Sequence, residues 1–260
     1  MSIITVCNHK GGTGKTTTSI HIAAALHLMG YKTMIIDLDP QAFLTRMMDI
    51  WPSDTANTSL DLFHSDSSLS DLEVLKLPPF DLLPCTGGMN HLSSKLTSAT
   101  DMFWVKEALQ DQSTYDTIII DTAAAVSVYA LNAMIAADTL MIPVVPEVQS
   151  VYGAEQTWGT AKEVQKKWNP NLKTAMFLLT NVDRRKKVHH QYSQYMRKTY
   201  DDLVMDTVIR TCASLAEVCR DGATVFERNL DSRGAKDYAA VVDELVRYVL
   251  PPARAEDEVG

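Results

Sequence analysis

The sequence has little of what marks secreted proteins, membrane proteins and metal-binding scaffolds. Only four cysteines occur in 260 residues, and no two are spaced as C-x-x-C, so neither a zinc site nor a bridging iron–sulfur cluster is predicted. We expect reduced, mostly packed thiols. The apolar runs, such as 117–120 and 176–179, are as short as strands, whereas a membrane-spanning helix needs roughly 20 apolar residues. Because the N-terminus also lacks the basic region of a signal peptide, we expect a cytoplasmic protein.

Positive charge is scarce as well. Lys and Arg number 24 against 32 Asp and Glu, which gives a net charge of −8. This balance argues against a protein that is basic all over, although it allows a local basic face. Hydrophobic residues make up 46% of the chain and charged residues 22%, as in ordinary globular proteins. The length suits one large domain, which we predict at 1–250, followed by an acidic, disordered tail at 251–260.

Short apolar runs alternate with segments of helical periodicity along most of the chain. Strands separated by crossover helices predict an α/β fold with one doubly wound, mainly parallel sheet and helices on both faces. The connection at 50–79 is rich in Ser, Asp and Pro, so we expect it to be mostly loop. The expected strands are 3–8, 33–36, 80–84, 117–121, 139–145 and 175–180, and the expected helices are 16–29, 148–168, 187–200 and 236–250.

A glycine-rich turn joins the first expected strand to the first expected helix. Residues 10–16 read Lys-Gly-Gly-Thr-Gly-Lys-Thr, a variant of the phosphate-binding P-loop. Glycines let successive backbone N–H groups point at phosphate oxygens, and the helix start adds its positive dipole end. We expect Lys15 to reach the β- and γ-phosphates of ATP and the Thr16 hydroxyl to bind Mg²⁺. The alternative is a plain turn with a solvated lysine, but the order of strand, loop and helix favours the P-loop.

Acidic residues end two further strands. Asp121 follows three isoleucines, the place where a second strand of a P-loop protein delivers a carboxylate to the Mg²⁺ shell. Asp37 and Asp39 end another strand, where one carboxylate can hold metal-bound water and the other can orient the attacking water. Simpler explanations exist for each, because acids often end buried strands and the pair Asp39-Pro40 favours a turn.

Together these motifs resemble a known family. The stretches 10–17, Lys-Gly-Gly-Thr-Gly-Lys-Thr-Thr, and 37–41, Asp-Leu-Asp-Pro-Gln, look like those of the ParA/Soj partition family. Its members are P-loop ATPases of the deviant Walker type, within the wider ParA/MinD group. The resemblance spans nearly the whole chain, because later stretches agree in order and spacing: 115–122, 183–185, 207–209 and 232–235.

The resemblance implies roles for individual residues. Lys10 matches the signature lysine that crosses an ATP-sandwich dimer to the partner's nucleotide, and Asp39 matches the acid required for hydrolysis. The expected catalytic residues are Lys10, Lys15 and Asp39, and the expected magnesium site consists of Thr16, Asp37 and Asp121. The expected nucleotide-binding residues are Lys10, Gly11, Gly12, Thr13, Gly14, Lys15, Thr16, Thr17, Arg210 and Cys212.

The same resemblance implies a working cycle. ATP closes a homodimer that binds non-specific double-stranded DNA, and a ParB-like or other cargo adaptor protein stimulates slow hydrolysis, which releases the subunits. Such proteins segregate plasmid or chromosomal DNA, or position another cargo, and are nucleoid-associated in the cytoplasm. Only one strand precedes the P-loop, so we expect no operator-reading helix-turn-helix domain and no sequence-specific repression.

The chain departs from the family pattern in two places. The family usually has Cys or Thr and then two prolines after the strand-end acid, whereas Thr122 leads here into three alanines at 123–125. Without prolines this switch segment lacks fixed φ angles. After Ile209 the family commonly has Pro-Arg-Asn near the adenine base, but 210–212 here is Arg-Thr-Cys. We therefore expect backbone groups to contact the base.

A basic run marks the expected DNA-binding face. The stretch 184–200 holds six Lys and Arg residues and no acid. Segregated positive charge of this kind is typical of contact with a phosphate backbone, although a solvated basic helix is the simpler alternative. The expected DNA-binding residues are Arg184, Arg185, Lys186, Lys187, Arg197, Lys198 and Arg220.

Three other functions remain as alternatives. A MinD-like ATPase acts at a membrane surface through a terminal basic amphipathic helix, but this chain ends in two prolines and the acidic stretch 256–258, which an anionic membrane would repel. No membrane binding is therefore expected. An ATP-locked DNA-binding protein with little turnover is conceivable because of the alanines at 123–125. A metal-cluster carrier of the same superfamily is disfavoured because paired cysteines are missing.

Overall fold

The computed structural model describes residues 1–64, 66–92, 96, 98–217 and 222–252, in which the chain forms a seven-stranded sheet. The strand order is β3-β4-β2-β5-β1-β6-β7, and neighbouring strands are parallel except β3 and β4. The chain starts in the middle of the sheet, winds to one edge, and returns through β5 to wind to the other. This confirms the predicted doubly wound α/β fold. The strands are β1 (Ser2–Val6), β2 (Thr33–Leu38), β3 (Leu75–Leu77), β4 (Phe80–Leu83), β5 (Thr117–Thr122), β6 (Thr139–Val144) and β7 (Thr174–Leu179).

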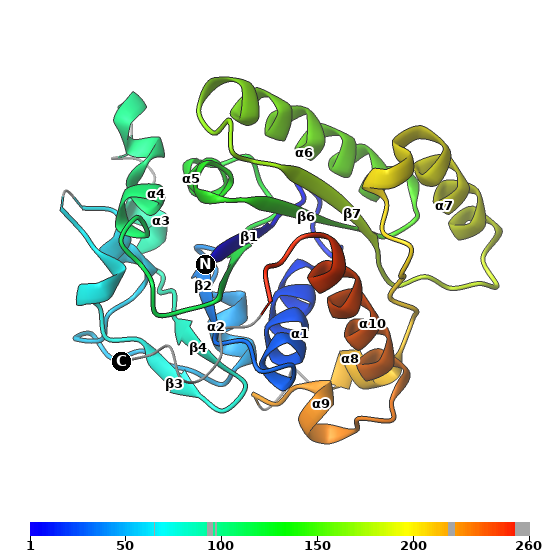
Figure 1. Cartoon of the computed structure of the whole chain (residues 1–260), viewed down its shortest axis with the longest axis horizontal. Coiled ribbons are helices and arrows are strands. Elements are labelled where there is room, and N and C mark those ends of the chain that lie inside the picture. The colour runs from blue at the N-terminus through cyan, green and yellow to red at the C-terminus, as the bar shows by residue number, and fades with distance from the viewer. Residues whose placement is uncertain (65, 93–95, 97, 218–221, 253–260) are drawn as a thin grey trace.

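Helices cover both faces of the sheet (Figure 1). Their bounds are α1 (Lys15–Leu28), α2 (Phe43–Met47), α3 (Met89–Leu92), α4 (Trp104–Ala108), α5 (Val128–Ala136), α6 (Val148–Lys167), α7 (Lys187–Tyr200), α8 (Ala213–Glu217), α9 (Val225–Arg228) and α10 (Arg233–Tyr248). Helices α1 and α10 lie side by side on one face, whereas α4, α5 and α6 cover the other. Helix α7 lies beyond the edge strand β7.

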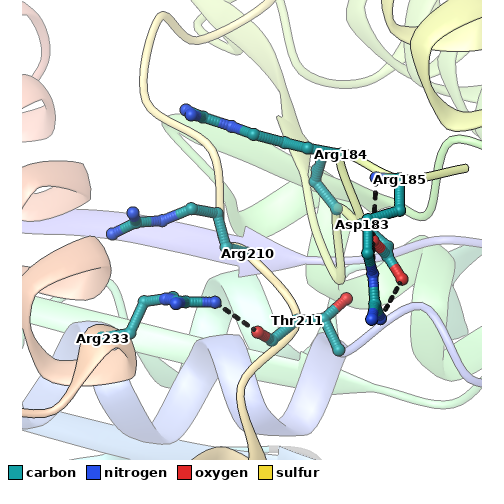
Figure 2. Close-up of a pocket in the computed structure, with 7 residues that line it drawn as sticks. Asp183, Arg184, Arg185, Arg210, Thr211 and Arg233 are labelled. Atoms are coloured by element: carbon teal, nitrogen blue, oxygen red, sulfur yellow. Dashed lines mark hydrogen bonds and ion pairs between the residues drawn. The ribbon is translucent and has the colours of Figure 1, made fainter.

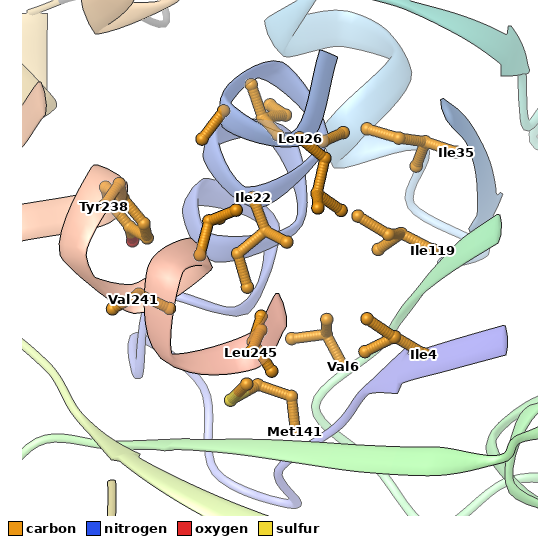
Figure 3. Packing of buried hydrophobic residues seen from close by; sticks show 14 of the residues in the cluster. Ile4, Val6, Ile22, Leu26, Ile35, Ile119, Met141, Tyr238, Val241 and Leu245 are labelled. Carbon is orange, nitrogen blue, oxygen red and sulfur yellow. The ribbon is translucent and has the colours of Figure 1, made fainter. Parts of the chain in front are cut away.

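The two faces follow from the alternating side chains of the buried strands. Ile4 and Val6 of β1 and Ile119 of β5 point toward α1 and α10. Figure 3 shows Ile22 of α1 and Leu245 of α10 closing over them. All five side chains are fully buried, and burying each contributes about 1.5–3 kcal/mol to stability. This core fixes α1, and with it the loop that α1 follows, against the central strands.

The register of the central strands brings their carboxyl ends together. β5 pairs with both β1 and β2, so that Val6 and Asp37 each lie opposite Asp121. In open α/β sheets, ligands bind in the crevice outside the carboxyl ends of the strands, where the winding reverses. The loops that follow β1, β2 and β5 therefore converge where a ligand is expected.

Several elements differ from the sequence-based expectation, including the short helices α2, α3, α4, α8 and α9, which were not predicted. The connection at 50–79 contains β3, which pairs antiparallel with β4, and two 3-10 turns, at Ser59–Leu62 and Leu69–Asp71. A strand of three residues is too short to show a period in the sequence. Helix α5 was not predicted because its window is apolar on most sides and lacks a helical stripe. Helix α10 begins at Arg233 rather than 236, because the Ser232 hydroxyl caps it by accepting a hydrogen bond from Ala235 N at 3.1 Å.

The cysteines of the described part of the chain are free thiols. Cys7 and Cys85 are buried and Cys212 is half-buried. Burial raises the pKa of Cys7 to about 11, which makes that thiol inert. Cys219 and the tail at 253–260 lie outside the described residues. Among the described helices, none combines the length and apolar character that crossing a bilayer requires.

Candidate nucleotide and magnesium site

The loop between β1 and α1 has a backbone that favours glycine. Gly12 and Gly14 have φ angles of 74° and 86°, in the region where an L side chain is strained. A Cβ added to either would approach no neighbouring atom closer than 3.9 Å, so there is space for a side chain. Glycine is therefore favoured by the backbone angle and not by crowding. The Thr180 hydroxyl, just after β7, donates a hydrogen bond to Thr13 O at 2.8 Å and anchors the loop. The N–H groups at the start of α1 can thus serve a phosphate.

Lys15 is buried although its side chain is charged. Its Nζ donates a hydrogen bond to Lys10 O at 3.2 Å, so the side chain folds back over the loop. Burial lowers the pKa of Lys15, and the negative charge of Asp121 opposes that shift. A buried cation beside a helix N-terminus attracts an anion. Lys15 therefore lies where the sequence predicts a phosphate.

Asp121 lies at the end of β5 and joins α1 through two hydroxyl groups. Thr16 Oγ1 donates a hydrogen bond to Asp121 Oδ2 at 2.8 Å, and Ser19 Oγ donates one to Asp121 Oδ1 at 2.7 Å. Burial, together with the negative charge of Asp37, raises the pKa of Asp121 to about 7. A buried carboxylate of this kind is stabilised in its charged form by a cation. Ser19 was missed from the sequence because a single helical serine carries no signal; its position three residues after Thr16, on the same helix face, is the only hint.

The oxygen groups at this site suit Mg²⁺. Thr16, Asp37 and Asp121 supply a hydroxyl and two carboxylates, which are ligands that Mg²⁺ prefers. Among the described residues, no cluster of three His, Cys, Asp or Glu side chains could hold a metal ion unaided. Mg²⁺ commonly binds through one or two carboxylates, waters and substrate phosphates, so this incomplete set fits a metal that arrives with a nucleotide.

Asp37 is held by hydrogen bonds to both of its carboxylate oxygens. Its Oδ1 accepts from Asp39 N at 3.0 Å, and its Oδ2 accepts from Thr45 N and Thr45 Oγ1 at 3.0 and 2.7 Å. Burial raises the pKa of Asp37 to about 6. Asp39 is also buried, and its Oδ1 accepts a hydrogen bond from Gln41 N at 2.9 Å. Burial raises the pKa of Asp39, whereas the positive charges of Lys15 and Arg46 lower it in part. Both acids therefore brace the turn after β2. They also interact electrostatically with the site, because Asp37 raises the pKa of Asp121 and Lys15 lowers the pKa of Asp39.

A cavity of about 260 Å³ adjoins the P-loop on the side of α10. Thr17, Cys212 and Tyr238 are among the residues that line it. Arg210 lines it too, but its guanidinium is bound to Asp237, with Nε 3.1 Å from Oδ1. Arg210 therefore presents mainly backbone to this cavity. The two residues that the resemblance assigned to the base thus flank a space beside the phosphate loop.

Lys10 lies on the outer side of the same loop and is exposed to solvent. A cavity of about 530 Å³ opens beside it, bordered by Gly12, Glu147 at the start of α6, and Asn181. The Lys10 N–H donates a hydrogen bond to Asn8 Oδ1 at 2.9 Å. The two lysines of the loop therefore differ: Lys15 folds inward, while Lys10 is exposed to solvent.

Four arginines surround another cavity, of about 450 Å³ (Figure 2). They are Arg184 and Arg185 in the loop before α7, Arg210, and Arg233 at the start of α10. Arg185 is paired with Asp183 through Nε–Oδ1 and Nη2–Oδ2 contacts of 3.0 and 2.9 Å, which hold the pKa of that carboxyl far below its usual range. In Figure 2, the Arg184 and Arg210 side chains extend in the same direction. An anion that entered here would meet the guanidinium groups of Arg184 and Arg233, whereas those of Arg185 and Arg210 are already paired with Asp183 and Asp237.

The predicted basic run is divided between the two ends of α7. Residues 184–187 lie at its start, and Arg197 and Lys198 lie in its last turn. The helix has 14 residues, so its ends are about 20 Å apart. Arg220 lies outside the described residues. Some of these cations are also paired within the chain: Arg185 with Asp183, Lys186 with Glu147 at 3.2 Å, and Arg197 with Asp206 at 3.8 Å.

Comparison with known proteins fits this geometry. A family model described as an AAA domain matches residues 1–174. The chain is 31% identical over 246 residues to the chromosome-partitioning ATPase Soj of Thermus thermophilus, an alignment that covers 95% of this chain and 96% of that protein. The chain belongs to the ParA/Soj family. A second Soj relative, the sporulation initiation inhibitor protein of Bacillus subtilis, is 30% identical over 248 residues, covering 94% of this chain and 97% of that protein.

A solved structure extends the likeness of this ParA/Soj chain to a nucleotide complex. Cobyrinic acid a,c-diamide synthase from Mycobacterium smegmatis, with bound ADP and magnesium, superposes with a TM-score of 0.80 at 26% identity. The match covers 98% of this chain and 100% of that one. The fold of this family member is therefore one that has been observed with a magnesium nucleotide bound.

The alanines that distinguish this ParA/Soj chain lie at the site. Ala124 and Ala125 are exposed, and Val126 after them is 62% exposed. The Ala124 Cβ lies 3.8 Å from the position that a Cβ on Gly11 would take. The segment therefore lies against the P-loop, although it lacks the prolines that the resemblance led us to expect.

Proposed function

We propose that this protein is a partition-type ATPase that positions DNA or another cargo. It binds Mg-ATP, closes into a homodimer, binds non-specific double-stranded DNA, and is released when a ParB-like or other cargo adaptor stimulates slow hydrolysis. The observation that carries this proposal is the cluster at the strand ends. There the buried Lys15, the Thr16–Asp121 pair and the acids after β2 converge on one glycine loop.

The roles within the site follow from the contacts of each side chain. Backbone N–H groups of 12–16 and Lys15 bind the phosphates, and Thr16, Asp121 and Asp37 are the residues that would hold Mg²⁺. Bound there, Mg²⁺ would supply positive charge to the phosphates. Asp39 orients and deprotonates the attacking water, for which its raised pKa is favourable. Hydrolysis therefore needs the carboxylates at the ends of both β2 and β5.

Dimerisation supplies the charge that one subunit lacks. We propose that Lys10 of each subunit reaches the nucleotide of its partner, which its exposure at the mouth of the loop supports. A cation contributed across the interface neutralises phosphate charge, so ATP stabilises the dimer and its hydrolysis releases the subunits. The 530 Å³ cavity beside Lys10 leaves space at this surface.

DNA binding is best supported at the arginine-lined cavity. Arg184 and Arg233 both line this cavity, and guanidinium groups bind phosphate oxygens with well-matched geometry. A dimer would present two such cavities, which increases both the affinity and its salt dependence. Lys186 and Lys187 at the start of α7 extend the same positive surface.

Retention of a random-sequence DNA duplex tests the proposal. The purified protein is incubated with ATP, with ADP or without nucleotide across a salt series, and phosphate release is followed in parallel. Tight, salt-sensitive retention with ATP alone, together with slow turnover, is the expected result. Retention that is equal in all nucleotide states, or absent in all of them, would contradict it.

A matched experiment replaces the DNA with anionic liposomes. No ATP-dependent binding is expected there, because α10 packs its apolar side chains, including Val241 and Leu245, against α1.

A second candidate is an ATP-locked DNA-binding protein with little turnover. The alanines at 123–125 favour it, because a switch segment without prolines can lose its coupling to the γ-phosphate. Steady-state phosphate release separates the two candidates. ATP-dependent DNA retention without turnover, even with DNA present and at long incubation, would favour the locked protein.

A further inference from the structure

Helix α6 and the loop that carries Lys10 pack together without room for a side chain. Gly153 of α6 is buried, and a Cβ added to it would lie 2.8 Å from Lys10 Cβ and 2.9 Å from Asn8 Oδ1. Real Cβ atoms essentially never approach other atoms below 3.0 Å. Glycine destabilises a helix relative to alanine. The close packing of α6 against Lys10 and Asn8 explains why a glycine stands at this position of the helix.

Thr157, one turn further along α6, holds the same loop by hydrogen bonds. Its hydroxyl accepts from His9 N at 3.0 Å and donates to Gly153 O at 2.7 Å. Asn8 is fixed in turn, because its Nδ2 donates to Pro143 O at 2.8 Å while its Oδ1 accepts from Lys10 N at 2.9 Å. Three successive residues, 8–10, are therefore positioned by α6 and β6 before the phosphate loop begins.

The phosphate-binding part of the loop is held by different contacts. Thr13 is anchored by Thr180, and Thr16 is bound to Asp121. Neither contact involves α6. The two parts are linked at Lys10 O, which accepts hydrogen bonds from Lys15 Nζ at 3.2 Å and Thr13 Oγ1 at 3.4 Å. Because Thr13 and Thr16 keep their own anchors on Thr180 and Asp121, we expect a change in α6 to displace Lys10 more than the groups that bind phosphate and Mg²⁺.

We propose that Gly153 and Thr157 are positioning residues that set where the Lys10 side chain leaves the monomer. By fixing residues 8–10 on α6, they aim Lys10 at the nucleotide of the partner subunit. This inference rests on the proposed role of Lys10 in the ATP dimer. It assigns to α6 a function in dimer closure that is separate from nucleotide binding by the monomer.

The main test is Gly153→Ala, with Gly159→Ala as the matched control. Both changes add one methyl group to the same helix, but a Cβ at 159 would have no neighbour within 4 Å. With Gly153→Ala, we expect ATP-dependent dimerisation, measured by sedimentation velocity with a non-hydrolysable ATP analogue, to weaken by about tenfold or more, since a displacement of about 1 Å can cost about a hundredfold. The monomer's affinity for a fluorescent ATP analogue should stay within about twofold of wild type. Gly159→Ala should match wild type in both.

Thr157 provides an independent pair of variants should Gly153→Ala fold poorly. Thr157→Val keeps the shape but removes the acceptor of the His9 N–H, whereas Thr157→Ser keeps the hydroxyl. We expect Thr157→Val to weaken dimerisation and Thr157→Ser to restore it. Equal dimerisation by the valine and serine variants, at equal thermal stability, would overturn the role of Thr157.

A double-mutant cycle with Lys10→Ala separates this inference from the proposed function. If α6 acts through Lys10, Gly153→Ala adds no further loss in the Lys10→Ala background. Losses that simply add would show that Gly153 acts by another route and would overturn the positioning role. If Lys10→Ala alone leaves dimerisation intact, the proposed role of Lys10 fails. If Lys10→Ala abolishes dimerisation but Gly153→Ala matches Gly159→Ala, only the inference about α6 fails.

Discussion

The strand-end site and the basic surface differ in how their charges are held. At the strand ends, Asp37, Asp121 and Lys15 are buried, and their polar atoms accept or donate specific hydrogen bonds. On the basic surface, Arg184 and Arg185 are exposed on a loop. Buried charges are held in place by their partners and destabilise the protein when they are unpaired. Exposed ion pairs contribute little to stability and can exchange partners freely.

This difference separates two kinds of function. The buried site is suited to a single ligand with defined geometry, because its carboxylates have raised pKa values that a cation can relieve. The exposed arginines suit a polyanion without a fixed register, since such binding depends on the number of charges more than on their precise positions. The variants below are designed to break one region while sparing the other.

The largest effect is expected for Asp121→Asn in the buried site. Turnover should fall by about a hundredfold or more, because a charged group that stabilises the transition state is lost. In magnesium-free buffer at pH 8, however, the free energy of unfolding should rise by about 1 kcal/mol or more, because the variant no longer buries a carboxylate. Phosphate release and urea titration measure the two effects.

The pH dependence of unfolding tests whether the buried charge of Asp121 causes this gain in stability. Burial raises the folded-state pKa of Asp121 to about 7, so the folded protein keeps a proton that the unfolded chain releases near pH 4. Stability therefore falls as pH rises from about 4 to 7 in the wild type, and this part of the fall should be missing in Asp121→Asn. Asp206→Asn removes the same charge from an exposed side chain and is the control. Equal pH profiles for the two variants would contradict the prediction.

The next effect concerns the arginine-lined cavity. The double change Arg184→Ala with Arg233→Ala should weaken ATP-dependent DNA retention by about tenfold and reduce the slope of log affinity against log salt by about two. Arg197→Ala with Lys198→Ala removes the same charge from the last turn of α7, outside this cavity, and should have a smaller effect. If the two pairs behave alike, net charge rather than the cavity determines binding.

A smaller effect is expected from His21, which lies behind the P-loop in α1. Its Nδ1 bonds to Thr17 O at 2.7 Å and its Nε2 accepts from Val225 N at 3.2 Å. Burial lowers the pKa of His21 to about 4, so between about pH 6.5 and 4 the unfolded chain binds a proton that the folded chain does not. This group therefore reduces stability as pH falls through that range.

His21→Asn should remove that loss, because Asn keeps a donor near Thr17 but does not titrate. Relative to the variant, wild type should lose about 1–2 kcal/mol of unfolding free energy between pH 6.5 and 4.5. Asp37 and Asp121 change the stability in the opposite direction over this pH range. Their contribution is the same in both proteins, so it cancels when the two unfolding free energies are subtracted. The same substitution at the exposed His190 is the control, and parallel curves for wild type and His21→Asn would show that His21 is not responsible.

The smallest effect is expected from Glu147→Gln at the start of α6. Glu147 pairs with Lys186 at 3.2 Å, with both side chains about half exposed. Without the carboxylate charge, Lys186 becomes available to phosphate, and DNA affinity should rise by about twofold at low salt. Fluorescence anisotropy of a labelled duplex measures it. A decrease in affinity would mean that the pair orders the start of α7 instead of masking it.

The buried site could largely be predicted from the sequence, because its signals are local. The P-loop spacing fixes Lys15 and Thr16 on a strand–loop–helix unit, and isoleucine runs place Asp121 at a strand end. The pairing register then brings Asp37 opposite Asp121. Ser19 and Thr45 could not be predicted, since single hydroxyl side chains in helices have no pattern until the fold brings a carboxylate to them.

The basic surface could be predicted only in part. Arg184 and Arg185 stand in a visible basic run, but Arg210 and Arg233 join them only because the segment after β7 and the start of α10 fold back beside that loop. The run also suggested one continuous face, whereas the length of α7 separates its two ends. Contacts between segments distant in the chain are set by packing and have no local signature.

Magnesium-dependent ATP binding is the measurement that tests the central claim most directly. Titration calorimetry of ATP into the wild-type protein, with and without Mg²⁺, measures whether the strand-end cluster acts as one metal–nucleotide site. We expect one ATP per chain, an affinity that falls by about tenfold or more without Mg²⁺, and loss of this Mg²⁺ dependence in Asp121→Asn. Equal ATP affinity with and without Mg²⁺, or an unchanged Mg²⁺ dependence in Asp121→Asn, would contradict the proposed site.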